Sequence, residues 1–180
     1  MGAAGSAIRG AEEGFGMGEI DKLLNRNRGY AESRRGRGAA EQRPVLPIAI
    51  VTCMDARIEP GRALGLVEGD AHVIRNAGAT VTDDVIRSLA ISQVVLGTRE
   101  VMLVKHTDCG LRRFDDDELR TTLAQATGAE PPFPLGTFRD LGEALRNETT
   151  RIRESPLLPC RENVRGFVYD VASGHLREVD

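Results

Sequence analysis

Two nearly uninterrupted apolar runs constrain this chain more than any other feature of its sequence. They are "VLPIAIVTC" (45–53) and "EVMLVKHT" (100–107). Strands that read as continuous apolar runs, rather than as alternating ones, are typical of parallel sheets covered on both faces. "AHVIRNAG" (71–78) predicts a further strand, and "DDVIRSLAISQVVLG" (83–97) predicts a helix with acidic residues in its first turn.

The rest of the chain continues the alternation. Short helices are predicted over 61–66 and 115–128, a longer one over 137–155, and a C-terminal hairpin over 163–171 and 175–179. Strands that alternate with helices predict an α/β fold with a mostly parallel sheet flanked by helices. We expect the strand order 2-1-3-4, with an added C-terminal edge strand.

The 180 residues predict one domain with a substantial core. Residues 1–16 are rich in Gly and Ala and are expected to form a flexible leader. Residues 17–180 are expected to form a single α/β domain. Within it, 17–40 is a helical arm and linker, and 45–180 is the core.

Composition excludes several classes of function. The net charge of −3 and the 4% aromatic content give no basis for nucleic-acid binding. No apolar run approaches the roughly 20 residues of a membrane span, so we expect no membrane partner. Three cysteines are too few for a disulfide framework, and they favour a reducing compartment, which predicts a cytoplasmic protein.

Side chains that bind soft metals follow both apolar runs. Cys53 ends the first, and His106 and Cys109 end the third predicted strand. Because the carboxyl ends of neighbouring parallel strands share one edge of a sheet, these three side chains are expected to converge. Two thiolates and one imidazole form a catalytic zinc set that leaves a fourth position open.

Two charged residues next to Cys53 are candidates for that fourth position. Asp55 can bind the metal or accept a hydrogen bond from a bound water, and Arg57 can hold the carboxylate in a bidentate pair. Simpler interpretations are a buried cysteine that only packs and a surface ion pair. His72 and His175 are possible proton shuttles, although ordinary histidines are the simpler interpretation, and Cys160 is expected to be a free or structural thiol.

The motifs "CMDAR", "RNAG" and "HTDCG", in this order and spacing, resemble those of the β-class carbonic anhydrases, in a short, bacterial-type branch. The resemblance implies an enzyme with one zinc per chain. It would hydrate carbon dioxide reversibly to bicarbonate and a proton by attack of zinc-bound hydroxide. The resemblance also implies a homodimer or a higher homo-oligomer.

The resemblance assigns roles residue by residue. Cys53, His106 and Cys109 would bind zinc. Asp55 and Arg57 would form the catalytic pair, with Asp55 as a fourth zinc ligand in one resting form. The remaining assignments concern contact with the substrate, and they fall on Asn76, Ala77, Gly78 and Gly110.

The sequence departs from the family pattern at two places. "LVEGDAHV" lacks the Gln of plant-like members, and Lys105 replaces the Gly that many members carry before the His. Two alternatives therefore stay open. One is a carbon disulfide or carbonyl sulfide hydrolase of the same fold, and the other is a non-catalytic, zinc-stabilised regulatory module.

Overall fold

The computed structural model describes residues 18–179. The predicted leader, 1–16, lies outside this range. The chain divides after Ala39 into two compact units, which are described separately below. None of the helices within the described residues combines the length and the apolar character that a membrane span requires.

In its described part, residues 18–39, the first unit contains one helix, α1 (Glu19–Ser33), which confirms the helix expected there. Gly18 precedes it, and the Asp21 carboxylate accepts a hydrogen bond from the Gly18 N–H at 3.2 Å. Acidic residues in the first turn favour this start because they face the positive end of the helix dipole. The apolar side chains of Ile20, Leu23 and Leu24 are exposed by 75%, 60% and 53%.

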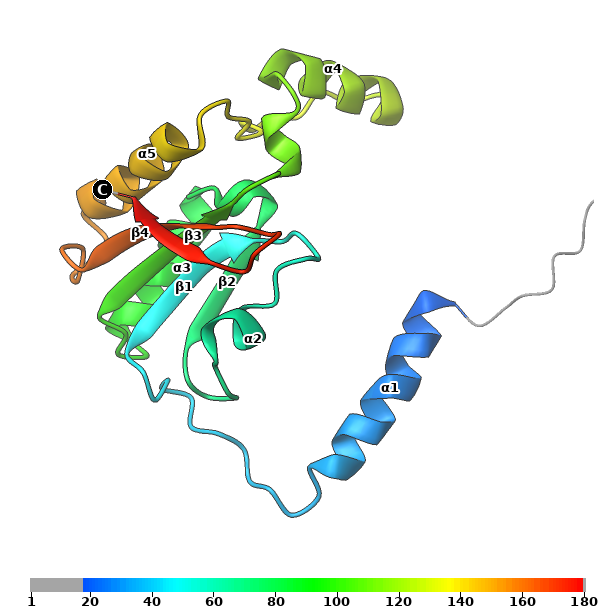
Figure 1. Ribbon diagram of the computed structural model, residues 1–180, viewed down its shortest axis with the longest axis vertical. Helices are drawn as coiled ribbons and strands as arrows, with labels where there is room; N and C mark the ends of the chain where they lie inside the picture. Colours follow the sequence, from blue (N-terminus) through cyan, green and yellow to red (C-terminus); the bar gives the residue numbers. More distant parts are fainter. Residues whose placement is uncertain (1–17, 180) are drawn as a thin grey trace, which may run out of the picture. The chain divides into compact units, whose positions relative to one another are not determined.

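The second unit is built on a five-stranded sheet with the order β2-β1-β3-β4-β5, which confirms the predicted topology (Figure 1). The strands are β1 (Ile48–Cys53), β2 (His72–Asn76), β3 (Glu100–His106), β4 (Val164–Tyr169) and β5 (Leu176–Val179). The first four run parallel, and β5 pairs antiparallel with β4. The helices are α2 (Pro60–Leu64), α3 (Asp83–Val94), α4 (Asp116–Thr127) and α5 (Leu141–Glu154), with short 3₁₀ turns η1 (Ala77–Ala79) and η2 (Gly110–Arg112).

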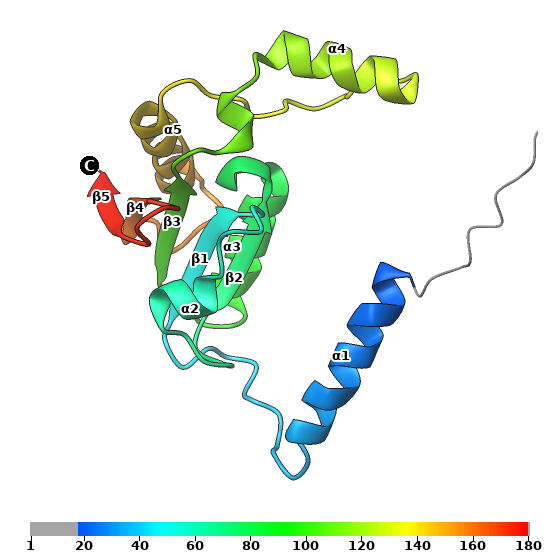
Figure 2. The ribbon, with the colours of Figure 1, turned by 45° about the vertical axis from the view of Figure 1, so that its right-hand side comes forward.

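One core joins α3 and α5 to the same face of the sheet. Its fully buried members are Ala49, Val51, Ala79, Val81, Leu89, Leu103, Leu145 and Ile152. Gly166 in β4 permits this packing, because a Cβ atom there would lie 2.9 Å from Cγ of Leu145 in α5. Figure 2 shows α2 on the side of the sheet opposite to α3.

Element boundaries differ from the sequence prediction where local hydrogen bonds compete with regular structure. The first strand was expected from 45, but the N–H groups of Val45 and Leu46 donate to the carbonyls of Gly69 and Asp70, so β1 starts at Ile48. The last helix was expected from 137. It starts four residues later because the Asp140 carboxylate caps it, accepting from the N–H of Glu143 at 2.7 Å.

Candidate metal centre

The three side chains predicted to bind metal lie together at the carboxyl ends of β1 and β3. These strands are direct neighbours, with Thr52 opposite Val104. The sulfur atoms of Cys53 and Cys109 and a ring nitrogen of His106 all lie within 4.8 Å of one another. All three residues are buried, which is unusual for a polar cluster without a ligand.

The hydrogen bonding of His106 determines which of its nitrogens can bind a metal. Nδ1 lies 2.9 Å from the carbonyl oxygen of Thr107. A carbonyl only accepts, so Nδ1 carries the hydrogen and Nε2 keeps a free lone pair. Nε2 is fully buried and has no hydrogen-bond partner within residues 18–179. A histidine fixed through Nδ1, with a bare Nε2, has the arrangement of a metal ligand.

The two cysteines form a pair in which one thiol supports ionisation of the other. The Cys109 thiol donates to Cys53, which lowers the pKa of Cys53 to about 3, and His106 and the backbone N–H groups of Asp55 and Gly78 contribute. The same contact raises the pKa of Cys109. The N–H of Gly78 lies 3.3 Å from the Cys53 sulfur. Within the pair, Cys53 therefore ionises more readily than Cys109.

The chemistry of these donors fits zinc. Two sulfurs and one imidazole nitrogen match the soft and borderline ligands that zinc prefers. Magnesium and calcium prefer oxygen ligands instead. Three protein ligands leave one position for a reactant. Apolar side chains of Ile58, Leu111, Phe138 and Tyr169 pack around the cysteines and limit access of water.

Asp55 lies beside this donor set and is held there by Arg57. The Asp55 carboxylate accepts from Nε of Arg57 at 2.9 Å and from Nη2 at 2.7 Å, and also from the Arg57 backbone N–H. These bonds hold the pKa of Asp55 well below its usual range. Its Oδ2 lies 3.9 Å from Nε2 of His106. A carboxylate therefore stands beside the three candidate ligands while it is paired with a guanidinium.

The outer face of the site contains a carboxylate that the sequence analysis missed. Asp108 accepts from Nη1 of Arg57 at 2.7 Å and from Nη2 of Arg113 at 2.7 Å. These contacts, that of Arg113 first, lower the pKa of Asp108 to about 2. Asp108 has a positive φ of 53°, an unusual conformation for a residue other than glycine. The sequence could have indicated this role, because Asp108 lies in "HTDCG" between the candidate ligands His106 and Cys109.

The predicted substrate-contacting residues occupy two turns. Asn76 spans the first turn, since its side-chain amide donates to the Thr80 carbonyl at 2.7 Å and accepts from the Thr80 N–H at 2.9 Å. Ala77 and Gly78 form η1 inside that bracket. Gly110 opens η2 directly after Cys109 and is exposed.

Comparison with known proteins agrees with this geometry. A family model described as "Carbonic anhydrase" matches residues 48–126, which include all three candidate ligands. Beta-carbonic anhydrase 1 of Mycobacterium tuberculosis is 48% identical over 163 residues, which cover 91% of this chain and 99% of that protein. This chain belongs to the β-carbonic anhydrase family.

Two further similar proteins share less of the sequence. The crystal structure of carbonic anhydrase from Streptococcus mutans superimposes with a TM-score of 0.86 at 39% identity, covering 92% of this chain and 99% of that one. A carbon disulfide hydrolase from Acidianus sp. is 33% identical, with 88% of each chain covered.

The remaining candidates are not members of the Cys53, His106 and Cys109 cluster. His72 begins β2, at the end of that strand opposite to Asn76, and its Nδ1 lies 2.8 Å from the Ser92 hydroxyl. His175 lies in the turn between β4 and β5, where its carbonyl accepts from the Asp170 N–H. Cys160 exchanges two backbone hydrogen bonds with the side chain of Gln93 and has a free thiol.

Proposed function

We propose that this protein is a zinc carbonic anhydrase that hydrates carbon dioxide reversibly to bicarbonate and a proton. One observation carries the proposal: a buried donor set of Cys53, His106 and Cys109 has the Arg57-bound carboxylate of Asp55 directly beside it. A purely structural zinc site normally fills all four positions with protein ligands, so this arrangement favours catalysis over a regulatory module.

In this proposal Cys53, His106 and Cys109 hold one zinc ion per chain. When bound, zinc supplies a nucleophile near neutral pH by making water more acidic, and it stabilises developing negative charge. The protein contributes the orientation of each ligand. Thr107 fixes the tautomer of His106, and Gly78 donates its N–H to the Cys53 sulfur.

Asp55 and Arg57 form the proposed catalytic pair. Arg57 keeps the pKa of Asp55 low, so the carboxylate stays ionised across the neutral range and acts as a hydrogen-bond acceptor, not as an acid. From its place beside His106, it can accept a hydrogen bond from the attacking water and so orient the oxygen lone pair toward carbon dioxide. If the pair opened, the same carboxylate would be placed to hold the metal as a further ligand.

The proposed substrate site lies against the two turns that flank the cysteines. Asn76 uses its side chain to fix the first turn, so its contribution is positional. Ala77 and Gly110 carry a small side chain or none, and a Cβ atom at Gly110 would meet nothing within 4 Å, which leaves room for a reactant of three or four heavy atoms. Gly78 can offer a reactant only its backbone, because Leu111 fills the space where its side chain would lie. The N–H of Gly110 is a candidate donor to an oxygen of bicarbonate.

The test is stopped-flow hydration of carbon dioxide by the purified protein, with zinc content measured on the same sample. Release of hydrogen sulfide from carbon disulfide, assayed in parallel, separates the second candidate activity, which the weaker relative from Acidianus sp. supports. A protein with one zinc per chain that accelerates neither reaction would leave the regulatory module as the better interpretation. Preferential hydrolysis of carbon disulfide would reassign the substrate.

We further propose a homodimer in the cytoplasm as the working form. The exposed apolar side chains of Ile20, Leu23 and Leu24 on α1 support self-association, because such a stripe gains stability when it is covered. The three free cysteines support a reducing compartment. Sedimentation equilibrium of the wild type and of a Leu23→Asp, Leu24→Asp variant tests the first point, and the variant is expected to shift toward monomer.

A further inference from the structure

Lys105 is the most deeply buried charged side chain of the described residues that the proposed reaction does not use. It lies in β3, directly before His106, and is 1% exposed. Its Nζ donates to the carbonyl oxygen of Gly78 at 2.7 Å, lies 3.7 Å from Oε1 of Glu148, and stands 4.6 Å from the centre of the Phe138 ring. Burying an ammonium group costs free energy, and these contacts offset part of that cost.

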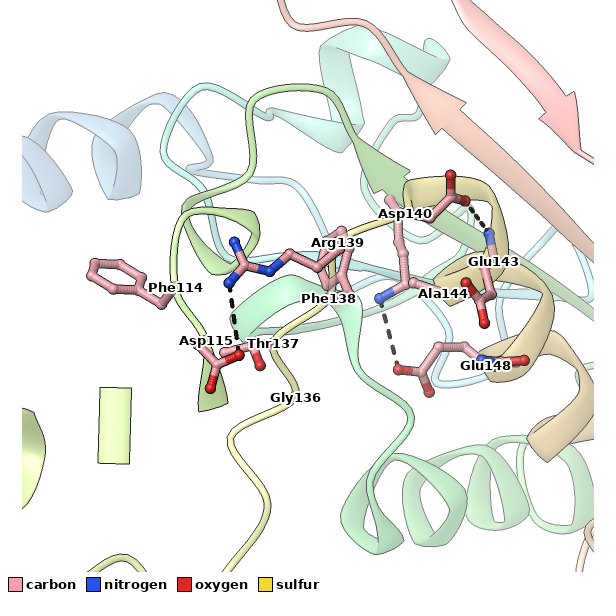
Figure 3. A pocket seen from close by; sticks show the side chains of 12 residues that line it. Phe114, Asp115, Gly136, Thr137, Phe138, Arg139, Asp140, Glu143, Ala144 and Glu148 are labelled. Atoms are coloured by element: carbon pink, nitrogen blue, oxygen red, sulfur yellow. Dashed lines mark hydrogen bonds and ion pairs between the residues drawn. The ribbon is translucent and has the colours of Figure 1, made fainter. Parts of the chain in front are cut away.

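Lys105 and Glu148 form hydrogen bonds with the backbone at the two ends of one short segment, residues 78–81. Lys105 holds the carbonyl of Gly78, while Oε2 of Glu148 accepts from the N–H of Val81 at 2.7 Å. Phe138 and Glu148 line a cavity of about 470 Å³, to which Lys105 also contributes (Figure 3). These two hydrogen bonds thus connect β3 and α5 to the turn that follows β2.

That turn is held in an unfavourable conformation. Gly78 has φ 71° and ψ 7°, and Ala79, which is fully buried, has φ 52°. Two successive residues in the left-handed region need support from their surroundings, especially where one of them carries a Cβ atom. Gly78 also has no room for a side chain, since a Cβ atom there would lie 2.7 Å from Cδ1 of Leu111.

A hydrogen bond connects this turn to the metal centre. The N–H of Gly78 lies 3.3 Å from the Cys53 sulfur, while the carbonyl of the same residue accepts from Lys105. A hydrogen bond to a thiolate withdraws charge from the sulfur and fixes its direction, so it changes how strongly that sulfur binds a metal.

We propose that Lys105 is a positioning residue which, through Gly78, aims a backbone N–H at Cys53 and so sets the ligand strength of this sulfur. An apolar side chain could fill the same space. It could not satisfy the Gly78 carbonyl, and the turn would relax toward a conformation that no longer points its N–H at Cys53. The inference rests on the zinc site proposed above and concerns this chain's own residues around it.

The test compares Lys105→Met, which keeps the length of the side chain but removes the donor, with the control Val101→Ala. Val101 is buried on the same strand, at the end far from His106. We expect Lys105→Met to lose about 10–100-fold in zinc affinity, measured by chelator competition. In the cobalt-substituted protein, its sulfur-to-metal charge-transfer band should move to lower energy. Val101→Ala should lower the unfolding temperature yet keep zinc affinity within about twofold.

A measurement on the unmutated protein covers the case in which Lys105→Met fails to fold. In the cadmium-substituted wild type, a scalar coupling between cadmium and the Gly78 amide proton, transmitted through the Cys53 sulfur, is expected. Its absence would overturn the proposal, and so would wild-type zinc affinity and an unshifted cobalt band in Lys105→Met. Equal losses in Lys105→Met and Val101→Ala would assign the effect to general destabilisation. A wild type that binds no metal would instead overturn the zinc site itself.

Discussion

The metal centre has an inner and an outer flank that are built by different means. On the inner flank, Cys53, Lys105 and His106 are each at most 4% exposed. On the outer flank, the side chains of Arg57, Asp108 and Arg113 are 45%, 50% and 66% exposed and are joined by ion pairs. Buried hydrogen bonds are costly to break, whereas exposed ion pairs contribute little each and exchange easily. The inner flank therefore suits retention of a metal, and the outer flank suits a group that changes partners during turnover.

The largest expected effect comes from breaking the inner flank. His106→Ala removes the nitrogen ligand and Cys53→Ser replaces a soft sulfur with a weak oxygen donor, so both variants should lose most of their zinc and their activity. Elemental analysis after dialysis measures zinc per chain. Retention of full zinc by both variants would contradict the ligand assignment.

The second largest effect is expected from breaking the ion pair of Asp55 and Arg57, which lies between the two flanks. Arg57→Ala leaves the Asp55 carboxylate without its partner, 3.9 Å from Nε2 of His106, where it can occupy the fourth metal position. Hydration of carbon dioxide should fall about 100-fold with zinc retained. In the wild type, activity should rise from neutral to alkaline pH, and in Arg57→Ala it should stay low throughout.

The control for this variant is Arg87→Ala, which removes an exposed arginine paired with Asp84 on α3 and should leave the profile unchanged. Stopped-flow rates against pH, with zinc measured in each sample, distinguish the outcomes. An Arg57→Ala enzyme as active as the wild type at every pH would rule out a role for the pair.

A smaller effect is expected from the outermost contact. Asp108→Asn keeps the shape of the side chain and tolerates the positive φ, but it weakens the bonds to Arg57 and Arg113. Turnover should fall by at most about fivefold. Because Arg113 and Arg57 lower the pKa of Asp108 to about 2, the wild-type carboxylate stays ionised above pH 4. The loss should therefore be the same from pH 6 to 9, and a loss confined to one end of that range would contradict this account.

The smallest effect is expected from substitution of the third cysteine, Cys160. Cys160 binds Gln93 through its backbone, not through its sulfur, and is not part of the metal cluster. Cys160→Ser should keep zinc content and turnover within about twofold of the wild type. A metal-free Cys160→Ser protein would show that the thiol set is wrong.

The sequence predicts only part of the metal centre, and the unpredicted contacts lie on both flanks. The strand order and the meeting of Cys53 with His106 follow from apolar runs that end in polar residues, a pattern local to each strand. The bond from Lys105 to Gly78 joins residues 27 apart, and that from Arg57 to Asp108 joins residues 51 apart. No local pattern encodes such pairs. A lysine in an apolar strand signals that a partner exists, but only the packed fold identifies it.

The pairing of β1 with β3 has a consequence for how the protein acquires its metal. Cys53 is made first, and His106 and Cys109 follow only after β2 and α3, so the donor atoms cannot meet until this long crossover has closed. Closing a loop of that length costs entropy before any ligand contact repays it. A nascent chain therefore offers zinc at most one of its three ligands for most of its synthesis. Metal uptake at the proposed site is therefore expected to be a late step, which stabilises a sheet that has already formed.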